Sequence, residues 1–118
     1  MITSIHHYEL AASATPEEFR AAIREAERRE CFDLPGLVEY RFLRGVKGAR
    51  RDDFAAIWTY ESREAWEALW GPVDDPVSKT DYPASWQVWE DDLLAPVLAR
   101  DPDEIEYTSY ETVEAFDS

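Results

Sequence analysis

Cysteine is almost absent from this chain of 118 residues, which contains only Cys31. A single thiol excludes an internal disulfide and a zinc site built from thiolates, and it is typical of a reducing compartment, so we expect a cytoplasmic protein. No His or Lys adjoins Cys31 in the sequence, and we expect an inert thiol. Because the sequence lacks both a charged N-terminal leader and any apolar run of about 18 residues, we expect neither a signal peptide nor a membrane span.

Basic residues are also scarce. The chain has 12 Lys and Arg against 26 Asp and Glu, which gives a formal net charge of −14 at pH 7. Phosphate recognition requires a basic surface, so we expect neither a nucleic-acid partner nor binding to an anionic membrane. The acidic runs lack the spacing of a calcium-binding loop, and we expect them on the solvated surface. They are Asp52-Asp53, Asp74-Asp75, Glu90-Asp91-Asp92 and residues 101–104. No glycine-rich phosphate loop or other cofactor motif is present, and we predict no cofactor and no metal ion.

Apolar residues, in contrast, are plentiful. They make up 45% of the chain and include five Trp, six Tyr and five Phe, which is enough for a packed core. A chain of this length is typical of one domain, and because no repeat or long linker divides it, we predict a single domain over residues 1–118. Four segments have the composition of β-strands. They are residues 2–10, 37–44, 54–61 and 105–116.

Side-chain alternation predicts the two faces of the sheet. In the first strand Ser4, His6 and Tyr8 share one face, while Ile5 and His7 share the other. In the second strand, Val38, Tyr40 and Phe42 alternate with Glu39, Arg41 and Leu43. The third strand is apolar on both faces, which indicates a central or doubly covered position.

Three segments have helical patterns. Thr15-Pro16-Glu17-Glu18 is typical of a helix start, because Thr caps free N–H groups and Glu completes a capping box. Ser62 begins a second helix over residues 63–70, which Gly71-Pro72 ends, and residues 85–98 form a third that ends or kinks at Pro96. The order β-α-β-β-α-(α)-β predicts an α+β fold of the ferredoxin-like type, with a four-stranded antiparallel sheet and its helices on one face. The other face, which carries Ile5 and Ile57, is expected to pair with a second copy.

Two short motifs give the chain a resemblance to a known superfamily. Leu34-Pro35-Gly36 before the second strand, and the run from Ile57 to Ser62 that joins the third strand to the second helix, resemble the dimeric α/β-barrel proteins. Within that superfamily the pattern is similar to stress-responsive barrel proteins, NIPSNAP-like proteins and antibiotic-biosynthesis monooxygenases. The resemblance implies a homodimer whose sheets meet back to back, with a pocket in each subunit between sheet and helices.

The resemblance implies a fold more than a chemistry, because the superfamily includes cofactor-free monooxygenases, polyketide cyclases, isomerases and haem-handling enzymes. In the cyclases a His on the first strand is paired with another in the loop after the second helix. Residues 71–85 contain no His, so the sequence departs from the cyclase pattern.

His6 is the candidate general acid or base, because imidazole titrates near neutral pH and alternation places His6 on the pocket side. The monooxygenase resemblance suggests that the hydroxyl of Tyr60 holds a phenolic substrate. The candidate ligand-binding residues are the aromatic side chains on the same face, namely Tyr8, Tyr40, Phe42 and Trp58. The same set is also the composition of an ordinary core, in which Tyr and Trp find hydrogen-bond partners at the edge.

Three functions remain open at this level. The first is a cofactor-free, monooxygenase-like enzyme for an aromatic or hydrophobic substrate, which requires a cavity of roughly a few hundred Å³ beside His6, Trp58 and Tyr60. The second is a stress-response or ligand-binding dimer without catalysis. The third is a haem-binding protein with His6 or His7 as the axial ligand. His6 and His7 point to opposite faces of a strand, so one metal ion cannot take both.

Overall fold

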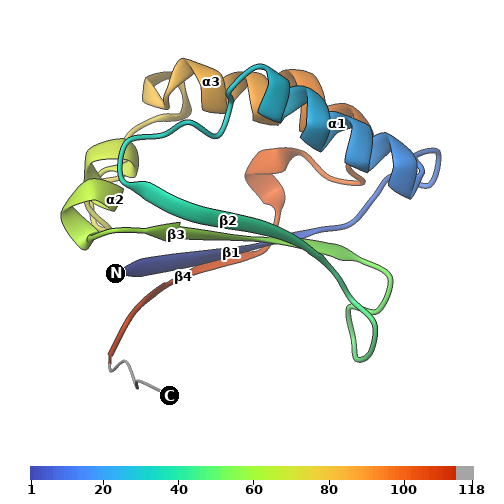
Figure 1. Cartoon of the computed structure of the whole chain (residues 1–118), viewed down its shortest axis with the longest axis horizontal. Helices are drawn as coiled ribbons and strands as arrows, with labels where there is room; N and C mark the ends of the chain where they lie inside the picture. Colours follow the sequence, from blue (N-terminus) through green and yellow to red (C-terminus); the bar gives the residue numbers. More distant parts are fainter. Residues whose placement is uncertain (114–118) are drawn as a thin grey trace.

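The computed structural model describes residues 1–113 and consists of one antiparallel sheet with a helical layer over one face (Figure 1). The strands are β1 (Ile2–Tyr8), β2 (Leu37–Arg44), β3 (Phe54–Tyr60) and β4 (Tyr107–Glu111). The helices are α1 (Pro16–Arg28), α2 (Arg63–Trp70) and α3 (Ala84–Gln87), and α3 continues as a π-helix (Val88–Leu94) and a 3₁₀ turn (Ala95–Val97). Further 3₁₀ turns lie at Lys79–Asp81 and Pro102–Glu104.

The sheet has the order β2-β3-β1-β4, and each neighbouring pair of strands is antiparallel. The helices cover one face and leave the other bare, which confirms the predicted ferredoxin-like α+β fold (Figure 1). Two predicted boundaries were too wide. The first strand ends at Tyr8, after which Leu10 forms an isolated bridge with Leu98. The predicted last strand is ordered over Tyr107–Glu111, and its predicted end at residues 114–116 lies outside the described residues.

The predicted orientation of one side chain in β2 was wrong. Val38 was placed on the face of Tyr40 and Phe42, but its side chain is 55% exposed, and Leu37 packs against the core instead. The strand has an irregularity here, since Leu37 lies opposite Tyr60 while Glu39 lies opposite the adjacent Thr59. An extra residue of this kind reverses the alternation on one side of it.

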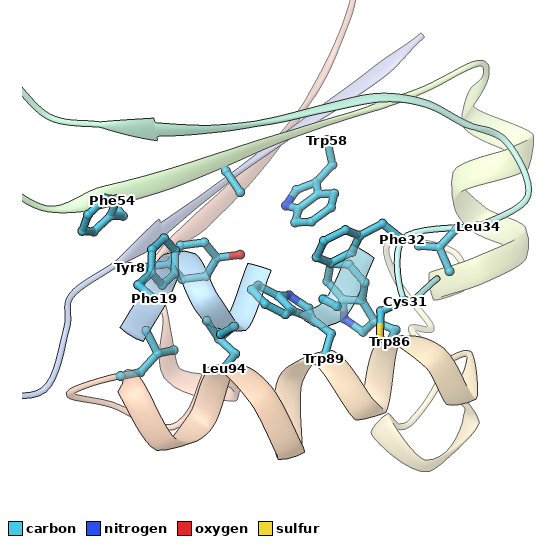
Figure 2. Close-up of a cluster of buried hydrophobic side chains, with 14 of the residues drawn as sticks. Tyr8, Phe19, Cys31, Phe32, Leu34, Phe54, Trp58, Trp86, Trp89 and Leu94 are labelled. Atoms are coloured by element: carbon cyan, nitrogen blue, oxygen red, sulfur yellow. The ribbon is translucent and has the colours of Figure 1, made fainter. Parts of the chain in front are cut away.

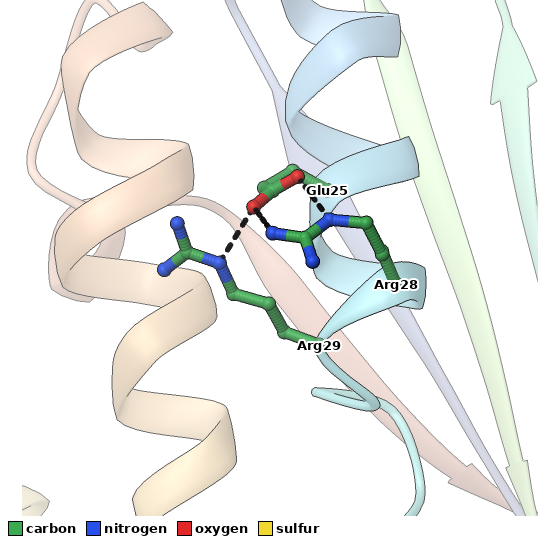
Figure 3. Close-up of polar contacts among 3 residues, drawn as sticks. All are labelled: Glu25, Arg28 and Arg29. Atoms are coloured by element: carbon green, nitrogen blue, oxygen red, sulfur yellow. Dashed lines mark hydrogen bonds and ion pairs between the residues drawn. The ribbon is translucent and has the colours of Figure 1, made fainter.

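Helix α1 begins as its sequence predicts. The Thr15 hydroxyl accepts a hydrogen bond from the Glu18 backbone N–H at 3.2 Å, and Pro16 occupies the first helical position. Near the other end, the Glu25 carboxylate accepts hydrogen bonds from Arg28 and from Arg29 (Figure 3). These bonds, that of Arg28 first, lower the pKa of Glu25 to about 2. The anchored helix turns Phe19, Ala22 and Ala26 toward the sheet.

The core between the layers consists mainly of aromatic rings. Trp58, at the middle of β3, points from the sheet toward Phe32 and the helical layer (Figure 2). Its ring centroid lies 5.1 Å from that of Phe32 and 4.9 Å from that of Trp86. Trp89 and Leu94 approach from the π-helix, and Tyr8 and Phe19 fill the space beside them (Figure 2). The space between the sheet and the helical layer around Trp58 is therefore filled by side chains.

Gly36 is the point where the chain entering β2 passes closest to α2. Its φ is +82°, and a Cβ placed on it would lie 2.5 Å from the Cβ of Ala65. Gly36→Ala is therefore expected to reduce the free energy of unfolding by about 2 to 3 kcal/mol, since it adds a clash to backbone strain. Gly48→Ala is the matched control, because Gly48 has φ +105° but nothing within 4 Å of a new Cβ. Urea unfolding that shows equal losses for the two variants would contradict the close approach.

Candidate functional site

A cavity of about 620 Å³ opens between the β1–β4 side of the sheet, helix α2 and the segment that follows α2. Its floor is the helix-facing side of the sheet, where the Ser4 and Ser109 hydroxyls hydrogen-bond at 2.7 Å. The sheet residues that line it are Ile2, Ser4, His6, Tyr60, Tyr107, Ser109 and Glu111. The volume lies within the range of small-molecule sites.

The walls of the cavity are mostly aromatic. Trp66 and Trp70 line it from α2, Tyr82 lines it from the segment that leads into α3, and Trp86 lines it from α3 itself. The ring centroid of Trp70 lies 5.1 Å from that of Tyr82 and 5.4 Å from that of Trp86. Edge-to-face packing holds these rings in place, so the wall is formed before any ligand binds.

His6 lies on the floor, where alternation along β1 predicted it. Its strand neighbours are the small Ala56 on β3 and Tyr107 on β4. The imidazole Nδ1 lies 3.5 Å from the Tyr8 hydroxyl, and the ring contacts Trp86 at a centroid distance of 6.2 Å. Burial, with a smaller contribution from the charge of His7, lowers the pKa of His6 to about 4. The imidazole is therefore neutral near pH 7 and able to accept a proton.

Tyr60 lines the same cavity at the end of β3 and is 2% exposed. Burial raises the pKa of its phenol well above the usual value, and a hydrogen bond with the side chain of Trp70 acts in the opposite direction. The hydroxyl therefore keeps its proton and can donate it in a hydrogen bond.

The four aromatic residues predicted to bind a ligand do not line the cavity. Trp58 and Tyr8 are 0% and 1% exposed and belong to the core behind His6. Tyr40 stacks on Trp58 and donates its hydroxyl to Glu27 of α1 at 2.7 Å, away from the cavity. Phe42 packs among the core rings and lies 5.8 Å from Trp89 between centroids. The structure thus places His6 and Tyr60 in the lining of one cavity but about 13 Å apart along the strands, since His6 pairs with Ala56 and Tyr60 with Ile2. The four predicted aromatic residues belong to the neighbouring core.

Glu90 is the functional candidate that sequence reasoning missed. The prediction that residues 90–92 lie on the solvated surface holds for Asp91 and Asp92 but is wrong for Glu90, which is 8% exposed. Glu90 lies in the π-helix and lines the cavity, and its Oε1 has no hydrogen-bond partner among the described residues. Burial raises its pKa to about 7, against the opposing charge of Lys79. Isolated π-helical turns occur frequently at functional sites.

Lys79 connects the segments around the cavity. Its ammonium group donates to Asp103 at 3.1 Å and lies 2.8 Å from Asp91 of the π-helix. These two carboxylates raise the pKa of Lys79, that of Asp91 first. At the opposite side Arg63 of α2 lies 3.8 Å from Glu111 of β4. Both basic groups of the cavity lining are thus already paired with carboxylates.

His7 points to the bare face of the sheet, beside a small hollow of about 70 Å³. Burial lowers the pKa of His7, the Arg50 charge adds to this, and Glu106 acts in the opposite direction. Within residues 1–113 no cluster of three or more His, Cys, Asp or Glu side chains is placed to hold a metal ion. A helix with the length and apolarity to cross a bilayer is likewise not found in that range.

No protein-family model and no curated protein matches this sequence significantly. Several solved structures, in contrast, match its fold. SnoaB, a cofactor-independent oxygenase from Streptomyces nogalater, has a TM-score of 0.64 at 11% identity, over 99% of this chain and 97% of that one. A dimeric ferredoxin-like protein of unknown function from Jannaschia sp. CCS1 has a TM-score of 0.65 at 15% identity, over 94% and 98%. A NIPSNAP domain protein from Burkholderia xenovorans has a TM-score of 0.62 at 14% identity, over 99% and 100%.

These similarities confirm the resemblance that the sequence indicated, at the level of the fold. The chain has the fold of dimeric ferredoxin-like proteins along nearly its whole length. Proteins with this fold include a cofactor-independent oxygenase and a protein of unknown function, so the chemistry of this chain rests on its own cavity.

The opposite pKa shifts of His6 and Glu90 give folding stability two opposing pH dependences. His6 has a pKa of about 4 when folded and 6.5 as a free side chain, so its contribution is present above pH 6.5 and lost as the pH falls toward 4. Glu90 has a pKa of about 7 when folded and 4.5 as a free side chain, so its contribution to folding stability is present below pH 4.5 and lost as the pH rises toward 7. Each shift corresponds to about 3 kcal/mol, and in the wild type the two largely cancel.

Single substitutions should separate the two effects. The stability of Glu90→Gln relative to the wild type is expected to rise by about 3 kcal/mol from pH 4.5 to 7, because the variant no longer ionises a buried carboxyl. His6→Gln should instead gain relative stability as the pH falls from 6.5 toward 4. Urea unfolding over a pH series measures both differences, and surface carboxylates common to all three proteins cancel. Differences that do not vary with pH would contradict the burial of these groups.

Proposed function

We propose that this protein binds a phenolic aromatic molecule in the cavity and oxidises it with dioxygen, without a bound cofactor. The observation that carries the proposal is the coexistence, in one cavity of about 620 Å³, of a neutral, half-buried imidazole, a buried phenol and an aromatic wall. The fold shared with SnoaB, a cofactor-independent oxygenase, agrees with this chemistry without assigning it.

In this proposal His6 acts first. Its neutral imidazole takes the proton of the substrate hydroxyl. Tyr60 pairs with Ile2 while His6 pairs with Ala56, so the Tyr60 hydroxyl donates its hydrogen bond to a part of the substrate further along the cavity. The pKa of about 4 makes His6 a weak base before substrate ionises. The phenolate formed beside it stabilises the imidazolium by opposite charge, which offsets the desolvation that lowered the pKa.

The electron-rich phenolate then reduces dioxygen directly. A new C–O bond forms at a ring carbon that carries hydrogen, and the O–O bond breaks. One oxygen atom becomes the second carbonyl oxygen of a quinone, and the other leaves as water with the hydrogens lost from the hydroxyl and the ring carbon. Phenol and dioxygen thus give quinone and water, with the electrons for the reduction supplied by the substrate. The aromatic wall would exclude bulk water during this step.

Oxygen consumption tests the proposal. Purified protein is incubated with a panel of phenols and naphthols in an oxygen-electrode cell, and products formed under labelled dioxygen are analysed by mass spectrometry. We expect stoichiometric uptake with one labelled atom in a quinone product. Tight binding without oxygen uptake would instead indicate the non-catalytic ligand-binding dimer. A Soret band on mixing with haem would indicate the haem-binding alternative.

We further propose that the bare face of the sheet forms a homodimer. The register places small and apolar side chains at its centre. They are Thr3, Ile5, Ala55, Ile57 and Thr59. The nearest charges on this face, Glu39 and Arg41, form their own ion pair at 3.4 Å, so two copies can approach with little uncompensated charge. The similar Jannaschia protein is itself dimeric, which supports a dimer of this chain.

Ile57→Arg should convert the dimer to a monomer, because the substitution buries an unpaired charge at the centre of the interface. Light scattering coupled to size-exclusion chromatography measures the mass. Val46→Arg is the control, since Val46 lies in the loop between β2 and β3 and is 83% exposed. A wild-type monomer, or an Ile57→Arg protein that stays dimeric, would contradict an interface on this face.

A further inference from the structure

Glu90 presents a buried carboxyl that the protein satisfies only in part, through a hydrogen bond with the side chain of Trp86. Its side chain is 8% exposed, and Oε1 makes no hydrogen bond within the described residues. The nearby cation of the cavity lining, Lys79, is engaged with Asp91 and Asp103. An unpartnered polar group in such a place costs folding free energy, which indicates that a ligand completes its hydrogen bonds.

The position of Glu90 in the fold gives its place in the cavity. His6 and Tyr60 belong to the sheet, whereas Glu90 belongs to the π-helix in the helical layer that covers the sheet. All three line one cavity. A flat ring held against the tryptophans of the wall is therefore placed to reach His6 with one edge and Glu90 with another.

The charges around the cavity limit what it can hold. Glu90, Asp103 and Glu111 contribute carboxyl groups to the lining, and the two basic residues there already have carboxylate partners. A carboxylate or phosphate ligand would meet repulsion without a free cation to offset it. A neutral ligand with hydroxyl or keto oxygens would not, and a carboxyl group can both donate to and accept from such oxygens.

We infer that Glu90 is a second substrate-binding group, and that the substrate is a neutral aromatic molecule with two oxygen functions, one held by His6 and the other by Glu90. The inference rests on the proposed function, since it specifies which phenols the cavity accepts. It excludes aromatic acids as good ligands. It also makes Glu90 a determinant of specificity that acts in binding, before any reaction with dioxygen.

Three probes of equal ring size test the inference by isothermal titration calorimetry. They are naphthol, a naphthalenediol with hydroxyls on opposite rings, and the hydroxynaphthoate in which a carboxylate replaces one hydroxyl. The wild type is expected to bind the diol about tenfold more tightly than naphthol, which is the effect of one added hydrogen bond to a buried group. Hydroxynaphthoate should bind more weakly than naphthol.

Substitutions at Glu90 then identify the group responsible. Glu90→Leu should bind the diol and naphthol equally, while Glu90→Gln should retain the preference because an amide both donates and accepts. Asp92→Asn is the matched control, since Asp92 lies in the same π-helix but is exposed. That variant should keep the wild-type preference.

The outcomes separate this inference from the proposed function. A diol preference that survives in Glu90→Leu, or one that is absent from the wild type, overturns the role of Glu90 even if the protein consumes oxygen. Binding with the expected preference but without oxygen uptake overturns the oxidation and leaves the role of Glu90 standing. Failure of all three probes to bind the wild type overturns both.

Discussion

Trp58→Ala is expected to reduce the free energy of unfolding by about 3 to 5 kcal/mol, the range for removing a large aromatic side chain from a packed core. Trp58 is 0% exposed and is surrounded by rings from both layers. Its centroid lies 4.9 Å from Trp86, 5.1 Å from Phe32 and 5.7 Å from Tyr40. Surrounding rings of this size cannot collapse fully into the space, so a cavity would remain in addition to the lost burial. Urea unfolding monitored by circular dichroism measures the loss.

Two further variants keep this expectation testable if Trp58→Ala fails to fold. Trp58→Phe retains a ring and removes an indole N–H that has no hydrogen-bond partner among the described residues, so its cost should be about 1 to 2 kcal/mol. Tyr107→Ala removes a ring that is 63% exposed and should change stability by less than about 1 kcal/mol. Equal losses for Trp58→Phe and Tyr107→Ala would show that Trp58 is not the centre of the core.

Local sequence patterns predicted which face each residue of β1 and β3 occupies. The alternation of β1 and β3 is regular, and it put His6, Trp58 and Tyr60 on the helix-covered side. It could not predict depth beneath the helices. Trp58 lies under the segment that contains Trp86 and Trp89, whereas His6 and Tyr60 lie beside it, where the segment after α2 encloses a cavity. That difference depends on tertiary placement, which no local pattern encodes.

Two other differences between the sequence predictions and the structure have distinct physical causes. The irregularity at the start of β2 exposes Val38, and a two-residue alternation cannot reveal the extra residue behind it. Glu90 was misassigned because its acidic neighbours suggested a solvated surface. A helical signal did exist, because Trp86, Glu90 and Leu94 recur every four residues and share the inward stripe. Helical position was the better guide to burial than the composition of the run.

His6→Ala is expected to reduce the turnover of a phenolic substrate by about a hundredfold to ten-thousandfold, the usual contribution of a positioned general base. The aromatic wall and Glu90 remain, so the loss should appear mainly in kcat, with a smaller loss of substrate affinity from the missing imidazole contact. His7→Ala is the matched control, because His7 adjoins His6 in β1 but points to the bare face. That variant should keep wild-type kcat.

The pH dependence gives a second readout of the same residue. Because the pKa of His6 is about 4 rather than 6.5, the imidazole stays neutral well below pH 6.5. The wild-type rate should therefore show no decline through pH 6.5 on acidification, and the decline should begin only as the pH approaches the lowered pKa. A loss of rate centred on pH 6.5 would place an unshifted imidazole at the reaction. Equal loss of kcat in His6→Ala and His7→Ala would assign the effect to the strand rather than to the base, since only His6 faces the cavity.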